Sequence, residues 1–124
     1  MVARETYLSK LRQLKDHNVI KVITGIRRSG KSTLLEAFKD ELISQGVARS
    51  SIVFLNFEER ENLNFTNWTT LYDEIIRSIG TGHKTYVFLD EVQLINDCEK
   101  LINRLYAKKN IDLSVDFSFL FFSS

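Results

Sequence analysis

Short apolar runs alternate with amphipathic stretches along this chain, and the alternation predicts a parallel α/β fold. Residues 52–55 and 86–89 are continuous apolar runs, a pattern typical of strands buried on both faces in parallel sheets. Residues 19–23 form a β-branched run that only Lys21 interrupts. Helical spacing of apolar residues follows each run. The order predicts a parallel sheet with helices on both of its faces.

Four stretches have apolar residues at helical spacing. They cover about residues 4–15, 31–45, 68–79 and 101–106. Gly46 is expected to stop the second helix, because glycine adopts the left-handed conformation that ends many helices. Asn67 is the expected N-cap of the third helix, and Asn96 or Asp97 that of the fourth. The predicted order is a helix followed by three strand-helix units.

The last segment, residues 111–122, is a strand candidate with two unlike faces. Apolar residues alternate in it with mostly polar ones, which is the period of a strand. A central strand of a parallel sheet has both faces covered and should avoid Asp116 and the neighbouring serines. We therefore expect this segment to fit the centre of the sheet poorly. The alternative is an exposed apolar end, which is an aggregation hazard.

Composition is that of a single soluble globular domain. The chain has 124 residues, of which 44% are hydrophobic and 27% charged. A formal net charge of +1 gives no basic excess that would indicate nucleic acid or a membrane surface as partner. The single cysteine, Cys98, excludes an internal disulfide framework and has no histidine nearby to make it a catalytic thiol. No secretory signal or long apolar stretch is present, so we expect a cytoplasmic protein.

Residues 25–32 match the complete phosphate-loop pattern G-x-x-x-x-G-K-[ST]. They read Gly25-Ile26-Arg27-Arg28-Ser29-Gly30-Lys31-Ser32. The glycines let backbone N–H groups turn toward a phosphate, and the following helix directs its positive end at the anion. Lys31 is expected to reach the β- and γ-phosphates, and the Ser32 hydroxyl to bind Mg²⁺. The predicted nucleotide-binding segment runs from residue 25 through Thr33.

The two loop arginines have two interpretations. Arg27 and Arg28 add positive charge beside a triphosphate, which would favour nucleotide binding. The plainer interpretation, which we favour, is that both are solvated residues of a loop.

A second acidic motif closes the third predicted strand, where Asp90 and Glu91 follow four apolar residues. In a phosphate-loop protein, Asp90 is expected to hold Mg²⁺ through its water shell. Glu91 is then expected to orient or deprotonate the attacking water. The plain alternative is a strand that runs into a polar loop. The D-x-x-G motif of GTPases is absent after Asp90, so we expect ATP rather than GTP.

Three segments together resemble one family of ATPases. They are residues 23–35 around the phosphate loop, Phe-Leu-Asn-Phe-Glu-Glu at 54–59 and Phe-Leu-Asp-Glu-Val-Gln at 88–93. The chain resembles, over about residues 4–113, the AAA-type ATPases of bacteria and archaea that join an N-terminal ATPase domain to a C-terminal domain of unknown function. The resemblance implies a three-layer P-loop NTPase fold and ATP hydrolysis. It also implies a homo-oligomer or a larger protein partner.

The resemblance assigns roles to matching residues. Lys31 and Glu91 would be catalytic, while Ser32 and Asp90 would bind Mg²⁺. The family continues after residue 113 as an apolar strand that ends in a Thr/Ser-Gly-Ser-Asn-like segment, which contacts the γ-phosphate or the attacking water. Residues 114–124 are instead rich in Phe and Ser.

The loss of the family pattern sets the predicted domain organisation. Residues 1–113 are expected to be the N-terminal part of an ATPase domain, incomplete at its C-terminal end. Residues 114–124 are expected to be an aberrant tail, explained by a frame shift. The predicted function is Mg²⁺-dependent ATP binding, with hydrolysis in the intact family. The alternatives are a chain that only binds nucleotide, a non-functional fragment and a small-molecule kinase.

Overall fold

The protein is an α/β sandwich in which a parallel sheet separates two pairs of helices. The computed structural model describes residues 2–15, 19–26, 31–57, 67–79 and 82–119. The elements in chain order are α1 (Val2–Leu14), β1 (Lys21–Ile26), α2 (Lys31–Ser44), η1 (Arg49–Ser51), β2 (Ile52–Asn56), α3 (Trp68–Ser78), β3 (Thr85–Asp90), η3 (Val92–Leu94), α4 (Cys98–Tyr106) and β4 (Ile111–Phe119).

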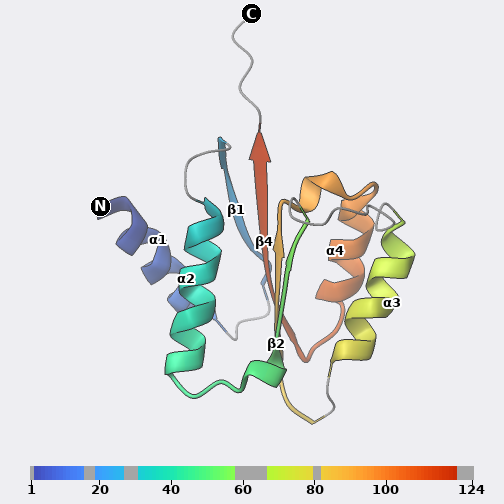
Figure 1. The fold of residues 1–124 in the computed structure, drawn as a ribbon, viewed down its shortest axis with the longest axis horizontal. Coiled ribbons are helices and arrows are strands. Elements are labelled where there is room, and N and C mark those ends of the chain that lie inside the picture. The colour runs from blue at the N-terminus through green and yellow to red at the C-terminus, as the bar shows by residue number, and fades with distance from the viewer. Residues whose placement is uncertain (1, 16–18, 27–30, 58–66, 80–81, 120–124) are drawn as a thin grey trace, which may run out of the picture.

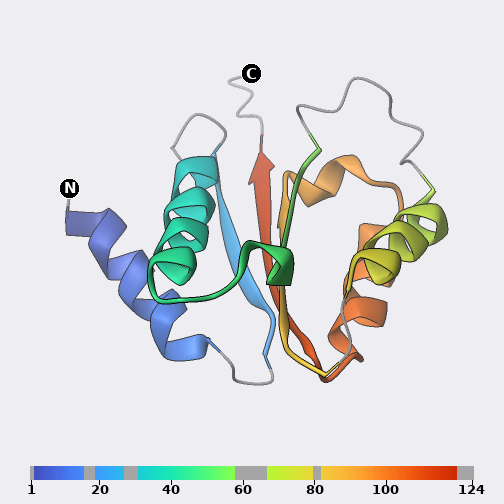
Figure 2. The same ribbon diagram turned by 60° about the horizontal axis from the view of Figure 1, so that its bottom comes forward.

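The described strands form one four-stranded parallel sheet in the order β1-β4-β3-β2. α1 and α2 cover one face of this sheet, and α3 and α4 cover the other (Figures 1 and 2). This arrangement confirms the predicted α/β class and its three layers. β4 lies between β1 and β3, so the strand before the phosphate loop and the strand before Asp90 are not direct neighbours.

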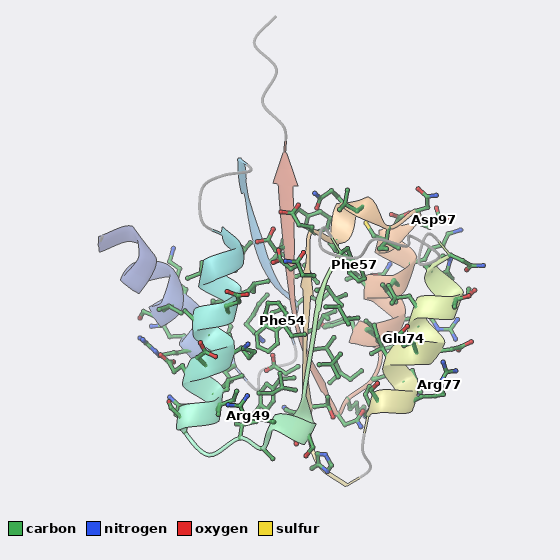
Figure 3. All side chains as sticks on the ribbon, in the orientation of Figure 1. Arg49, Phe54, Phe57, Glu74, Arg77 and Asp97 are labelled. Carbon is green, nitrogen blue, oxygen red and sulfur yellow. The ribbon has the colours of Figure 1, made fainter. Side chains whose placement is uncertain are left out.

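The two faces of the sheet bury separate apolar clusters. Phe38 of α2 and Phe54 of β2 both contact Phe88 of β3, with ring centroids 6.0 and 5.6 Å away. On the other face, Leu71 of α3 and Leu101 of α4 are fully buried together with Val87 and Leu89 of β3. Figure 3 shows the division, because Phe54 points toward α2 and Phe57 lies on the side of α4.

Two of the three helix-capping residues predicted from the sequence have the expected conformation or hydrogen bond. The Asn67 side chain accepts a hydrogen bond from the Thr69 backbone N–H at 2.9 Å, which confirms the predicted cap. Gly46 follows α2 with φ of 104°, a conformation that glycine adopts without strain. Asp97 precedes α4 as predicted but makes no side-chain cap hydrogen bond.

β1 differs from its prediction at both ends. It begins at Lys21 rather than residue 19 and continues to Ile26. Gly25 and Ile26 were predicted to open the phosphate loop, but they pair in register with Ser118 and Phe119 of β4. Pairing with a long neighbouring strand therefore extends β1 into the motif.

β4 occupies the centre of the sheet, and the prediction that its sequence fits there poorly is wrong. Its apolar residues Leu113 and Val115 are buried in the cluster shared with α3 and α4. The alternate residues Asp112, Ser114 and Asp116 are buried as well, on the face that α2 contacts. Asp112 is compensated there by the buried ammonium group of Lys21, and Asp116 lies beside Asp90 and Glu91. The strand also crosses the predicted boundary at residue 113, while the frame-shift interpretation stays a prediction.

Candidate functional site

The phosphate-loop motif connects the end of β1 to the start of α2. Gly25 and Ile26 end the strand, and α2 begins at Lys31. Arg27, Arg28, Ser29 and Gly30 lie outside the described residues. The structure describes the backbone of the first helical turn, so the side-chain roles of Lys31, Ser32 and Thr33 stay predictions. The turn lies at the carboxyl end of β1 (Figure 1), where its N–H groups suit an anion.

Three carboxylates from two strands converge at the same edge of the sheet. Asp90 is the last residue of β3, Glu91 follows it, and Asp116 lies near the end of β4. One oxygen from each lies within 4.8 Å of the others, and all three residues are buried. Sequence reasoning predicted Asp90 and Glu91 here but treated Asp116 only as an obstacle to a central strand. The strand period places Asp116 on the α2 side, and that alternation is the signal that could have found it.

This donor set fits a hard divalent cation. Carboxylate oxygens are ligands that Mg²⁺ prefers, and Mg²⁺ commonly takes one or two of them beside phosphates and water. Buried like charges at this separation repel one another, and a cation between them offsets the repulsion. Asp90 and Asp116 come from adjacent strands, which gives the cluster a rigid support. The predicted magnesium residue Asp90 is therefore placed where it could hold the ion, with Asp116 as an additional acidic neighbour.

The end of β3 is fixed by hydrogen bonds on its β2 side. Asn56 is opposite Asp90 in the register of the two strands. The Phe57 backbone N–H donates to the Asp90 carbonyl oxygen at 3.0 Å, and Phe57 itself is buried. Glu58 and Glu59, the acidic pair that follows, lie outside the described residues.

Glu91 has an unusual backbone conformation. Its φ of 62° and ψ of 44° lie in the left-handed region, which few non-glycine residues occupy. Its carbonyl oxygen accepts a hydrogen bond from the Leu94 N–H at 3.1 Å. Its Oε1 atom accepts a second from Gln93 Nε2 at 2.7 Å. Such local strain is common at functional sites, where the surrounding structure maintains it.

Cys98 has the properties of an ordinary helix residue. It is the first residue of α4 and partly buried. Burial raises the pKa of its thiol above the usual value, and the negative charges of Glu99 and Asp97 add to this effect. A raised pKa leaves less of the reactive thiolate at neutral pH.

We compared the described helices with the length and polarity that a membrane span requires. Within the part of the chain that the structure describes, each helix is too short or too polar to span a bilayer.

Comparison with known proteins places this geometry in a family. The chain is 39% identical over 117 residues to an uncharacterized protein of Haemophilus influenzae, and the match covers 93% of this chain but 29% of that protein. The solved structure of Caenorhabditis elegans PCH-2 matches 98% of this chain and 37% of its own length, with a TM-score of 0.56 and 15% identity. That likeness supports the fold. The family described as "AAA domain" matches residues 17–121, and the chain therefore belongs to the AAA domain family.

Proposed function

We propose that this chain binds ATP together with Mg²⁺ at the carboxyl edge of its sheet and that the domain hydrolyses the ATP. The observation that carries the proposal is the convergence of Asp90, Glu91 and Asp116 at the edge where α2 begins. Ligands of open α/β sheets bind outside the carboxyl ends of the strands. Membership of the AAA domain family supports a nucleotide as that ligand.

The proposed roles follow the chemistry of phosphoryl transfer. When bound, Mg²⁺ would supply positive charge that offsets the charge of the phosphates and polarises the γ-phosphate. Asp90 and the Ser32 hydroxyl would hold the ion, and the Lys31 ammonium would contact the phosphate oxygens. Glu91 would accept a proton from the attacking water as the new O–P bond forms. The bond between the γ-phosphorus and the bridging oxygen breaks, which gives ADP and phosphate.

Substitution of Lys31 tests nucleotide binding. Lys31→Ala should abolish binding of a fluorescent ATP analogue, because the ammonium group that contacts the phosphates is lost. The matched control is Lys39→Ala on the same helix, since Lys39 contacts the Phe54 ring 5.2 Å away and Asp40 at 3.8 Å. Binding should survive in the control. If Lys31→Ala also retains full affinity, the phosphate-loop assignment is wrong.

A second candidate function is nucleotide binding without turnover. Asp116 lies in β4, and in the family that the sequence resembles this strand ends in a Thr/Ser-Gly-Ser-Asn-like segment. A carboxylate repels the γ-phosphate, whereas a hydroxyl donates a hydrogen bond to it. Steady-state phosphate release separates the two candidates, since only an ATPase produces phosphate. Glu91→Gln should preserve analogue binding and remove the release.

Assembly is part of the proposal for the whole protein. The chain spans 29% of the length of its Haemophilus relative, so the oligomer or larger protein partner expected for the family belongs to the longer protein. Analytical ultracentrifugation with and without ATP and Mg²⁺ tests whether this chain associates by itself.

A further inference from the structure

We infer that Gln93 is a positioning residue that holds the Glu91 carboxylate for catalysis, an inference that rests on the proposed function. Gln93 Nε2 donates a hydrogen bond to Glu91 Oε1 at 2.7 Å. The acceptor is a carboxylate, and hydrogen bonds to ionised groups are shorter and stronger than those between neutral groups. The bond fixes one of the two oxygens and so restricts rotation of the carboxylate about its last side-chain bond.

The backbone around Gln93 keeps its side chain within reach. Gln93 is the exposed middle residue of the 3₁₀ turn Val92–Leu94. Val92 is fully buried in the cluster under α4, and Ile95 is 2% exposed in the same cluster. The Ile95 N–H also donates to the Val92 carbonyl oxygen at 3.0 Å. Because both sides of the turn are anchored, the Gln93 side chain can fold back over it to Glu91.

Two other carboxyl groups lie close to the Glu91 side chain and affect its orientation. Its carboxylate is buried and lies within 4.8 Å of carboxylate oxygens of Asp90 and Asp116. Repulsion from these groups favours rotation of the Glu91 side chain away from them. A general base has to stay within hydrogen-bond reach of the water that it deprotonates. A misplacement of about 1 Å reduces turnover by as much as about 100-fold.

An uncharged donor suits this position. Gln93 can hold Oε1 without adding a positive charge that would compete with the metal ion for the carboxylates. Gln93→Met preserves the length of the side chain but removes the donor. Gln93→Glu removes the donor and adds a fourth negative charge. The inference predicts a loss of turnover in both variants, larger in Gln93→Glu.

The kinetic test uses the full chain and measures phosphate release and analogue binding in parallel. Gln93→Met should lower kcat by about tenfold, the effect of one hydrogen bond to a charged group, with unchanged analogue affinity and denaturation midpoint. The matched control is Gln45→Met, at an exposed position after α2, which should leave all three values unchanged. An unchanged kcat in Gln93→Met overturns the inference. Absence of phosphate release in the unsubstituted chain overturns the proposed hydrolysis as well.

A spectroscopic readout needs no turnover. The side-chain amide signals of Gln93, assigned by their absence in Gln93→Met, should shift in Glu91→Ala but not in the control Glu99→Ala. Amide signals unchanged in Glu91→Ala would show that the hydrogen bond is absent in solution.

Discussion

β4 carries an aspartate near each end of its polar face, and the two have opposite surroundings. Asp112, near the start of the strand, forms a buried ion pair with Lys21 of β1. Asp116, near the end, lies beside Asp90 and Glu91. The two aspartates are 4% and 0% exposed. Both are buried, and the neighbours described here differ: a lysine at Asp112 and two carboxyl groups at Asp116.

This difference indicates that the role of a buried carboxylate, structural or functional, depends on its position along a parallel strand. At the amino end of the sheet, a lysine from the neighbouring strand compensates Asp112 within the chain. The pair joins β1 to β4 across 91 residues of sequence, and we interpret it as fixing the place of β4 in the sheet. At the carboxyl end, where ligands of such sheets bind, carboxylates gather instead. We interpret the Lys21–Asp112 pair as structural, and the three carboxylates as a candidate Mg²⁺ site.

The largest predicted effect comes from breaking the ion pair. Lys21→Met retains most of the side-chain volume but leaves Asp112 buried without its cation, and the free energy of unfolding should fall by about 3–5 kcal/mol. Chemical denaturation followed by circular dichroism measures this loss. The control is Arg12→Met, because Arg12 pairs with Glu41 at 2.7 Å on the surface and such pairs contribute at most about 1 kcal/mol. Equal losses in the two variants would show that the buried pair has no special role.

For Asp116 of β4 we predict a smaller change in the free energy of unfolding, of the opposite sign. Asp116→Asn removes one of three clustered, buried carboxyl groups, so without Mg²⁺ the free energy of unfolding should stay constant or rise by about 1 kcal/mol. The same denaturation measurement applies. Asp112→Asn is the matched control on the same strand face and should lower stability. A clear loss of stability in Asp116→Asn would mean that Asp116 is structural, like Asp112.

The smallest predicted effect uses Cys98 as a reporter. The raised pKa of its thiol means that less thiolate is present at pH 7 than in a free cysteine, so labelling by iodoacetamide should be slower than that of a free cysteine and should accelerate as the pH rises. Mass spectrometry measures the rate. Lys21→Met should accelerate labelling by opening the fold more often, and Asp116→Asn should not. Labelling at the rate of free cysteine would contradict the protection of Cys98.

Local patterns were sufficient to predict much of the fold. The apolar run at residues 86–89 corresponds to β3, and the amphipathic stretch from Trp68 corresponds to α3 with the predicted Asn67 cap. These elements depend on neighbours in the sequence. The place of β4 could not be derived in this way, because Asp112 on its polar face is compensated by Lys21, which is 91 residues away in the chain. Lys21 was visible only as an interruption in an apolar run, and nothing near it indicated Asp112.

The same distinction holds for the candidate site. Asp90 and Glu91 follow a strand directly, so sequence alone predicted that they lie together at its end. Asp116 joins them only because β4 lies beside β3. The hydrogen bond from Gln93 accompanies a left-handed conformation of Glu91, which no residue type at position 91 indicated.

The affinity of the purified chain for ATP with and without Mg²⁺ tests the central claim most directly. The account predicts that Mg²⁺ tightens ATP binding and that Asp90→Asn removes this dependence, because the carboxylate that would hold the ion is lost. Bound nucleotide should also raise stability, by about 2.7 kcal/mol when the free ligand is at 100 times its Kd. Equal ATP affinity in Mg²⁺ and in EDTA, or no binding in either, would contradict the assignment of the acidic cluster as a Mg²⁺-nucleotide site.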